Sequence, residues 1–180
     1  MASRSYSTPA LVLKRKKVGE TDNIVFLLAQ KYGRFVAVAK GVRKLNSSKR
    51  AFMEPGNIIK AHLIKTRSLP LLTQAKLISD TGDIRSDLAR IRRLVQILEI
   101  FDKLFVEQEL DYRLHKLVLG IREDIIQERT GNAIIQKKLN QLILGLGFPA
   151  ADMTRYDSIL DYVSEIADRP MRSFDYLQVK

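Results

Sequence analysis

The pattern of hydrophobic positions changes once along the chain, near residue 80. Before that point, short apolar or alternating runs are separated by turn residues, which is typical of β-strands. In the fourth run Ile59, Ala61 and Leu63 share one face, while Lys60 and His62 share the other, as expected when one side of a strand is buried. The runs predict five strands, over residues 10–18, 23–30, 34–40, 57–66 and 71–79.

Turn residues separate the first three predicted strands, at Gly19-Glu20-Thr21-Asp22 and at Lys31-Tyr32-Gly33. A longer connection from Gly41 to Arg50 joins the third strand to the fourth, and it contains four cations and no periodicity. We expect it to be a mobile basic loop. Five short strands with a long third connection fit a small Greek-key barrel such as the OB-fold.

After the fifth run the apolar residues recur at steps of three and four, which indicates amphipathic helices. The spacing predicts four helices, over residues 83–105 with Asp83 as N-cap, 112–128, 133–146 and 156–167. The chain is therefore predicted to have two domains of the β + α kind. Residues 1–80 form a basic five-stranded OB-fold barrel that binds nucleic acid, and residues 81–180 form an all-α domain.

The charge is divided at the same place as the hydrophobic pattern. Residues 1–80 contain 16 Lys/Arg against 4 Asp/Glu, a balance of +12, whereas residues 81–180 contain 15 against 16, a balance of −1. A positive potential confined to one region is typical of a module that binds a polyanion, because each neutralised phosphate releases counterions. Nucleic acid is the leading candidate partner.

Cations gather at the ends of the predicted strands. Lys14 to Lys17 close the first strand, and its alternation sends two of them to each face, so we expect them in solvent at the strand end. Others lie at strand termini that could meet at one rim of the barrel. The candidate DNA-binding residues are Lys14, Arg15, Lys16, Lys17, Arg34, Lys40, Arg43, Lys44, Lys49, Arg50, Lys65 and Arg67.

Aromatic rings on which bases could stack are few in this half. Single-strand binding proteins combine such rings with cations. The available rings are Tyr6, Tyr32, Phe35 and Phe52. A lone Phe on a strand is more often core than stacking platform, so Phe26 and Phe35 are assigned to the core.

Catalytic and metal-binding patterns are missing from the sequence. There is no cysteine, the two histidines are isolated, and neither glycine-rich phosphate loop is present. The longest apolar run, Ile24 to Ala29, is too short to cross a bilayer, and the first residues lack the apolar stretch of a secretory signal. We expect a non-catalytic cytoplasmic protein with no cofactor, no metal and no membrane contact.

Several segments together resemble the bacterial recombination mediator RecO family. The most specific are Val18-Gly19-Glu20-Thr21-Asp22-Asn23-Ile24-Val25 and Tyr32-Gly33-Arg34-Phe35-Val36-Ala37-Val38-Ala39-Lys40-Gly41-Val42-Arg43. Phe52-Met53-Glu54-Pro55 and Gly147-Phe148-Pro149 are similar to later landmarks of that family. The resemblance covers most of residues 9–150 and has the same order of segments.

The resemblance implies an OB-fold joined to a helical domain, and a role in recombinational DNA repair at the nucleoid. RecO-like proteins bind single- and double-stranded DNA, anneal complementary strands, contact RecR and the tail of single-strand binding protein, and help to load the recombinase RecA. The tail-docking site would lie in the helical domain, at residues that cannot be matched one by one. The positions that match the family's DNA-contacting cations are Lys14, Arg15, Lys40, Arg43, Lys44, Lys49 and Arg50.

Two departures from that family stand out. Many members have a four-cysteine zinc site, which this chain lacks, and members commonly run on beyond the position of Lys180. Two alternatives fit the same charge. One is a ribosome- or RNA-associated OB-fold protein, which would prefer RNA to DNA of equal sequence. The other is an adaptor whose basic half binds an acidic protein.

Overall fold

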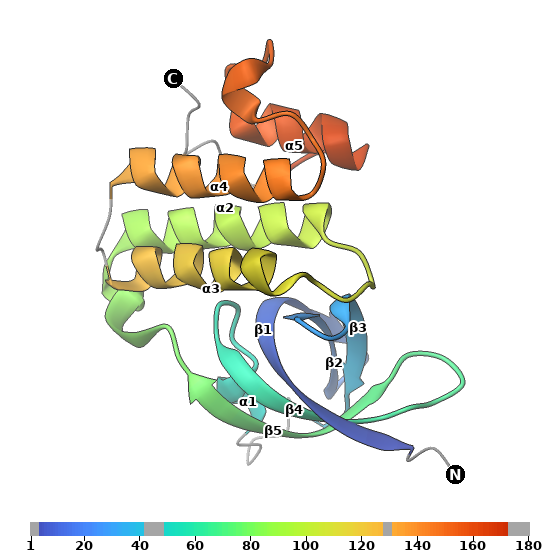
Figure 1. Ribbon diagram of the computed structural model, residues 1–180. Coiled ribbons are helices and arrows are strands. Elements are labelled where there is room, and N and C mark those ends of the chain that lie inside the picture. The colour runs from blue at the N-terminus through green and yellow to red at the C-terminus, as the bar shows by residue number, and fades with distance from the viewer. Residues whose placement is uncertain (1–3, 42–48, 128–130, 173–180) are drawn as a thin grey trace. The chain divides into compact units, whose positions relative to one another are not determined.

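The computed structural model (Figure 1) describes residues 4–41, 49–127 and 131–172, and only the backbone of Lys49, Arg50 and Arg85. The chain forms two compact units. The first contains residues 1–81 together with residues 105–110, and we call it the barrel unit. The second contains residues 82–104 and 111–180, and we call it the helical unit.

The barrel unit confirms the five predicted strands and the OB-fold arrangement. The strands pair in the closed order β1-β2-β3-β5-β4. A single helical turn, α1 (Lys49–Phe52), lies between β3 and β4, where the long basic connection was predicted; residues 42–48 of that connection lie outside the described residues. The strands are β1 (Ser5–Val18), β2 (Asp22–Ala29), β3 (Gly33–Ala39), β4 (Ile58–Ile64) and β5 (Leu71–Ser79).

Strand β1 is long enough to belong to both halves of the barrel. Its first part, from Ser5 to Leu11, pairs with β4, and its second part, from Leu11 to Val18, pairs with β2. Between Val12 and Lys14 the register with β2 shifts by one residue, which is a β-bulge. Because a bulge bends its strand and increases the local twist, it helps β1 to curve between its two neighbours, β4 and β2, in the closed barrel (Figure 1).

The core of the barrel consists of alternate residues of the five strands. Strands β3 and β4 contribute Phe35 and several alanines, and the small alanines leave room for larger side chains from β1, β2 and β5. Phe35 is 3% exposed, so its assignment to the core is confirmed. The fully buried members are Val12, Val25, Leu27, Ala29, Ala37, Ala39, Met53, Ile59 and Ala61.

The β2–β3 turn accepts a segment from much later in the chain. Gly33 has a φ of +65°, and a Cβ there would lie 2.3 Å from the carbonyl oxygen of Val106. The next residue, Arg34, donates its backbone N–H to that same oxygen at 2.9 Å. Residues 105–110 therefore join the barrel unit, although the hydrophobic pattern places them in the helical half.

The helical unit contains the four predicted helices. Helix α2 packs against α3 and α5, and α3 packs against α4. Two short 3₁₀ turns, Gly82–Ser86 and Ala151–Met153, precede α2 and α5. The helices are α2 (Leu88–Leu104), α3 (Tyr112–Gln127), α4 (Asn132–Gly145) and α5 (Ile159–Ala167).

Helix α2 begins later than its pattern predicts. The Asp87 carboxylate accepts hydrogen bonds from the backbone N–H groups of Ala89 at 2.9 Å and Arg90 at 3.1 Å, so Asp87 is the N-cap. The assignment of that role to Asp83 was wrong. Asp83 lies inside a 3₁₀ turn with φ −80° and ψ 15°, which keeps its backbone out of the α-helix.

Candidate nucleic-acid interface

The outer face of the β1–β2–β3 sheet is where the predicted cations meet an aromatic ring. In the register of the strands, Lys14 lies opposite Phe26, and Phe26 lies opposite Val36 of β3. Lys16 lies opposite Ile24, two residues further along the same face. The bulge before Lys14 makes Lys14 and Lys16 point to the same side of the sheet as the outward residues of β2, because a one-residue shift exchanges the two faces of a strand.

Three cations surround the Phe26 ring. The Lys14 Nζ lies 4.4 Å from the ring centroid, the Arg34 Cζ lies 5.0 Å away, and the Lys16 Nζ lies 5.8 Å away. Cations within about 6 Å of a ring centroid are attracted to its face. We call Phe26, Lys14, Lys16 and Arg34 the Phe26 face.

The assignment of Phe26 to the core was wrong. Phe26 is half-buried on the outside of the barrel, and the core cluster draws instead on its neighbours Val25 and Leu27. Every residue from Ile24 to Ala29 is apolar, so alternation could not show which of them point outward. The signal that could have identified Phe26 is its cross-strand pairing with Lys14, which only the register supplies.

The two remaining cations of β1 have the opposite orientation. Arg15 lies opposite the core residue Val25, and its Nη2 forms an ion pair with the Glu54 Oε1 at 2.8 Å. Lys17 is exposed, near the end of the strand. The sequence predicted that all four cations of residues 14–17 would be exposed at the strand end. Lys16 and Lys17 are exposed, whereas Lys14 and Arg15 are half-buried.

A second group of rings and cations lies around Tyr6 and Tyr32. Their ring centroids are 4.9 Å apart, the Lys65 Nζ lies 5.9 Å from the Tyr6 ring, and the Lys31 Nζ lies 5.8 Å from the Tyr32 ring. Burial, and then the neighbouring Tyr32 and Glu107, raise the pKa of the Tyr6 phenol, so it stays protonated near neutral pH. Lys31 was missed as a site residue, although it stands beside Tyr32 in the sequence.

The other two candidate rings pack inward. Phe35 belongs to the core, and the partly buried Phe52 packs against it. Tyr6 and Tyr32 also pack against the core, and their rings have described cations beside them.

Among the remaining predicted cations that the structure describes, Arg34 and Lys40 do not meet at one rim. Arg34 and Lys40 stand at opposite ends of β3, six positions apart in the sequence, which corresponds to about 20 Å along an extended strand. Arg67 is exposed in the β4–β5 connection. Arg43 and Lys44 lie outside the described residues, and the side chains of Lys49 and Arg50 on α1 do too.

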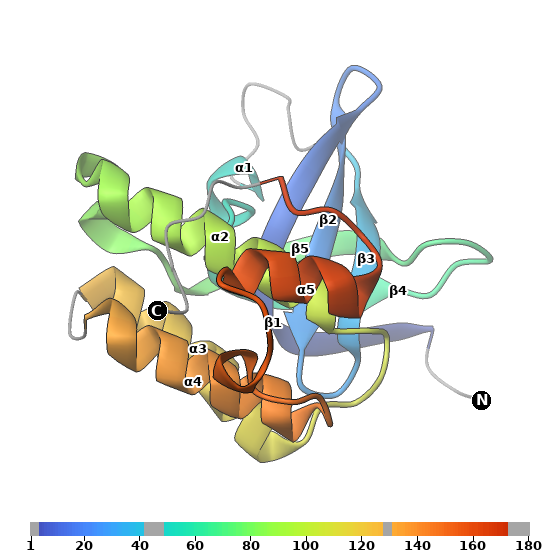
Figure 2. The same cartoon turned by 90° about the horizontal axis from the view of Figure 1, so that it is seen from above.

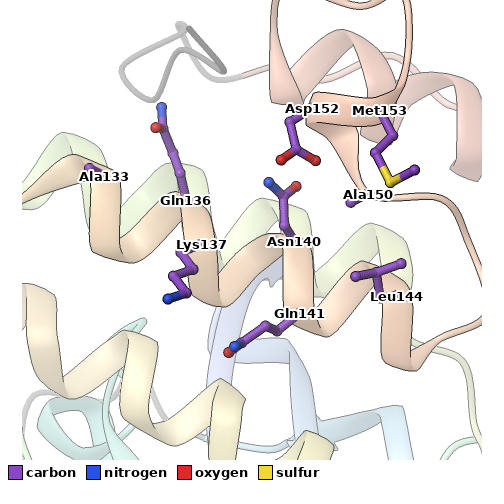
Figure 3. A pocket seen from close by; sticks show the side chains of 9 residues that line it. All are labelled: Ala133, Gln136, Lys137, Asn140, Gln141, Leu144, Ala150, Asp152 and Met153. Atoms are coloured by element: carbon purple, nitrogen blue, oxygen red, sulfur yellow. The ribbon is translucent and has the colours of Figure 1, made fainter.

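The helical unit has a groove of about 430 Å³ between α4 and the second 3₁₀ turn (Figure 3). The Asn140 side chain accepts a hydrogen bond from the Ala151 backbone N–H at 3.0 Å, which ties the turn to the helix. Its lining includes one cation, Lys137, one carboxylate, Asp152, and the largely exposed Met153.

No cluster of three or more potential metal ligands occurs in the described part of the chain. In that same part, none of the helices has the length and apolar character needed to span a membrane.

A closed five-stranded barrel with a helix between its third and fourth strands defines an OB-fold protein, here with a basic, aromatic outer face. Residues 1–80 match the family model described as "Recombination protein O N terminal". A curated relative, "DNA repair protein RecO" of Syntrophomonas wolfei subsp. wolfei, is 27% identical over 139 residues, covering 77% of this chain and 56% of that protein. Over these ranges the chain is similar to the RecO family. It spans about half the length of the curated relative that it matches.

Proposed function

We propose that this chain is a non-catalytic DNA-binding protein of recombinational repair and that its Phe26 face binds single-stranded DNA. The observation that carries the proposal is the placement of three cations around one outward-facing phenylalanine. The strands involved include β2 and β3, whose outer face is where OB-folds bind oligonucleotides. Similarity to the RecO family supports the same conclusion.

The chemistry of the Phe26 face suits a flexible strand. A base stacks on the Phe26 ring, while Lys14, Lys16 and Arg34 turn from the ring to the phosphates on either side of that base. Stacking contributes about 1–3 kcal/mol per base and tolerates any base, because every base has a π-face. We therefore expect binding with little sequence preference.

Other predicted cations extend this footprint. Lys17 at the end of β1 and Lys40 after β3 are both exposed in the same unit. The basic connection contributes Arg43, Lys44, Lys49 and Arg50. Each additional phosphate contact steepens the dependence of affinity on salt, by about 0.7 in the log–log slope for a single strand.

The finer functions are proposed from the similarity to the RecO family and not from the geometry. We propose that the chain also binds double-stranded DNA, anneals complementary strands and assists recombinase loading. Its proposed protein partners are a RecR-like protein and single-strand binding protein. The contacts with these partners are assigned to the helical unit, without a residue-by-residue match.

Fluorescence anisotropy tests the proposal with labelled single-stranded DNA, duplex DNA and RNA of equal sequence, across a salt series. We expect tight binding to DNA that weakens steeply as salt rises. A strong preference for RNA would favour an RNA-associated protein instead. Weak affinity for all three would favour an acidic protein as the partner of the basic barrel unit.

A further inference from the structure

Two lysines face each other on a different part of the barrel. Lys60 of β4 and Lys76 of β5 are direct register partners, and both side chains are exposed on the outer surface. The Cβ atoms of such partners lie about 5 Å apart, and like charges directly opposite one another destabilise a sheet. The Lys60–Lys76 pair therefore destabilises the sheet locally.

Nothing on these strands offsets the repulsion. Strands β4 and β5 contain no Asp or Glu, and no acidic side chain of the described residues forms an ion pair with Lys60 or Lys76. Polar groups surround the two charges. His62 lies next to Lys60 on the same face, its Nδ1 is 2.6 Å from the Ser7 Oγ, and Gln74 lies opposite it.

This surface is separate from the Phe26 face. Strands β4 and β2 lie on opposite sides of β1, so their outward residues point to different sides of the barrel. Figure 2 shows the β1–β2 hairpin and the β4–β5 connection leaving the barrel in different directions. A short strand bound along the Phe26 face would not reach Lys60 and Lys76.

We propose that Lys60 and Lys76, with Ser7, His62 and Gln74 beside them, bind the phosphate backbone of a second nucleic-acid strand. We call this surface the β4–β5 face. The proposal rests on the proposed function, since it assigns a second site to the same kind of ligand. A polyanion removes the repulsion between the two lysines, and this compensates for the cost that the pair imposes on the free protein.

The β4–β5 face differs from the Phe26 face in what it recognises. Its two strands contain no Phe, Tyr or Trp, and its one aromatic ring is the imidazole of His62, whose Nδ1 lies 2.6 Å from the Ser7 Oγ. It contacts phosphates alone and accepts a single strand or one strand of a duplex equally well. With both faces occupied, one barrel holds two strands at once, which is the geometry that pairing of complementary strands requires.

The test counts short oligonucleotides bound per chain. An oligonucleotide of about eight nucleotides is within the site size of one OB-fold and too short to follow the barrel from one face to the other. Calorimetric titration of the full chain gives the stoichiometry and both dissociation constants. For two phosphate contacts the second site should have a log–log salt slope of about −1.4, so its affinity falls about sevenfold between 50 and 200 mM salt.

The key variant is K60E/K76E, compared with K116E/K137E, which makes the same change in net charge on the helical unit. We expect two oligonucleotides per wild-type and control chain and one per K60E/K76E chain, with the first site unchanged within about twofold. K60Q/K76Q removes both charges without adding repulsion, so it should lose the second site while its melting temperature does not fall. F26L should weaken the first site and leave the second.

The outcomes separate the two proposals. Two oligonucleotides bound per folded K60E/K76E chain would overturn the β4–β5 site. A wild-type stoichiometry of one, sensitive to F26L, would overturn it as well, while supporting the Phe26 face. A wild-type chain that binds no oligonucleotide would overturn both.

Discussion

Replacing Phe26 by Leu should weaken the binding of single-stranded DNA while the barrel stays folded. Leu keeps an apolar side chain at this half-buried position, so the free energy of unfolding should fall by less than about 1.5 kcal/mol. The ring is lost, and with it the stacking of one base, which is worth about 1–3 kcal/mol. The dissociation constant should therefore rise about 5- to 150-fold.

An abasic oligonucleotide separates stacking from every other effect of F26L. An oligonucleotide with abasic sites has the same phosphates and no bases, so the wild-type chain should bind it more weakly and F26L should bind it equally weakly. The measurement is fluorescence anisotropy of both oligonucleotides with both proteins, at one salt concentration. The difference between the two losses gives the stacking free energy directly.

Tyr112 offers a matched control. It is 56% exposed, and the Lys116 Nζ lies 4.9 Å from its ring centroid, so it reproduces the pairing of an aromatic ring with a lysine on the helical unit. Y112L should leave affinity unchanged. The reasoning is refuted if F26L binds as tightly as the wild type, or if F26L loses the same factor on normal and abasic oligonucleotides.

Four further predictions concern charge, packing and pH. Replacing all three cations of the Phe26 face by Gln should make the log–log salt slope for single-stranded DNA shallower by about 2, measured by anisotropy across a salt series; an unchanged slope would remove these cations from the interface. The single change Lys60→Glu creates an opposite-charge pair with Lys76, so chemical denaturation should show about 0.2–1 kcal/mol of added stability that shrinks in high salt; a loss of stability would contradict the register. Gly33→Ala should destabilise the chain by more than Gly19→Ala. An alanine at either position has to adopt a positive φ, which costs about 1–2 kcal/mol, but of these two positions only Gly33 has backbone atoms where the new Cβ would lie. Equal losses of unfolding free energy in a urea titration would argue against the packing of residues 105–110 on the turn. Burial lowers the pKa of the His115 imidazole from its usual 6.5, so the folded state binds this proton less readily than the unfolded state does. The melting temperature should therefore decline as the pH falls below 6.5. His115→Gln should flatten that decline, and an unchanged decline would assign it to other groups.

Local chemistry along the sequence determined the five strands, the turns between the first three, and the existence of four helices. The turns are set by single residues: Gly19 and Gly33 both adopt positive φ, which glycine does at little cost. The change in hydrophobic period near residue 80 marks where strands give way to helices, because burial of one face requires a period of two in a strand and about 3.6 in a helix. Both signals are contained in short windows of the chain.

The candidate sites depended on the tertiary structure, because they are made by residues that are distant in the sequence. The outward position of Phe26 follows from the register of β1 and β2 and the bulge before Lys14, and an all-apolar run contains no information about which face it buries. The juxtaposition of Lys60 and Lys76 likewise follows from the register of β4 and β5. Register is set by the packing of the whole barrel, and so these surfaces appear only when the barrel closes.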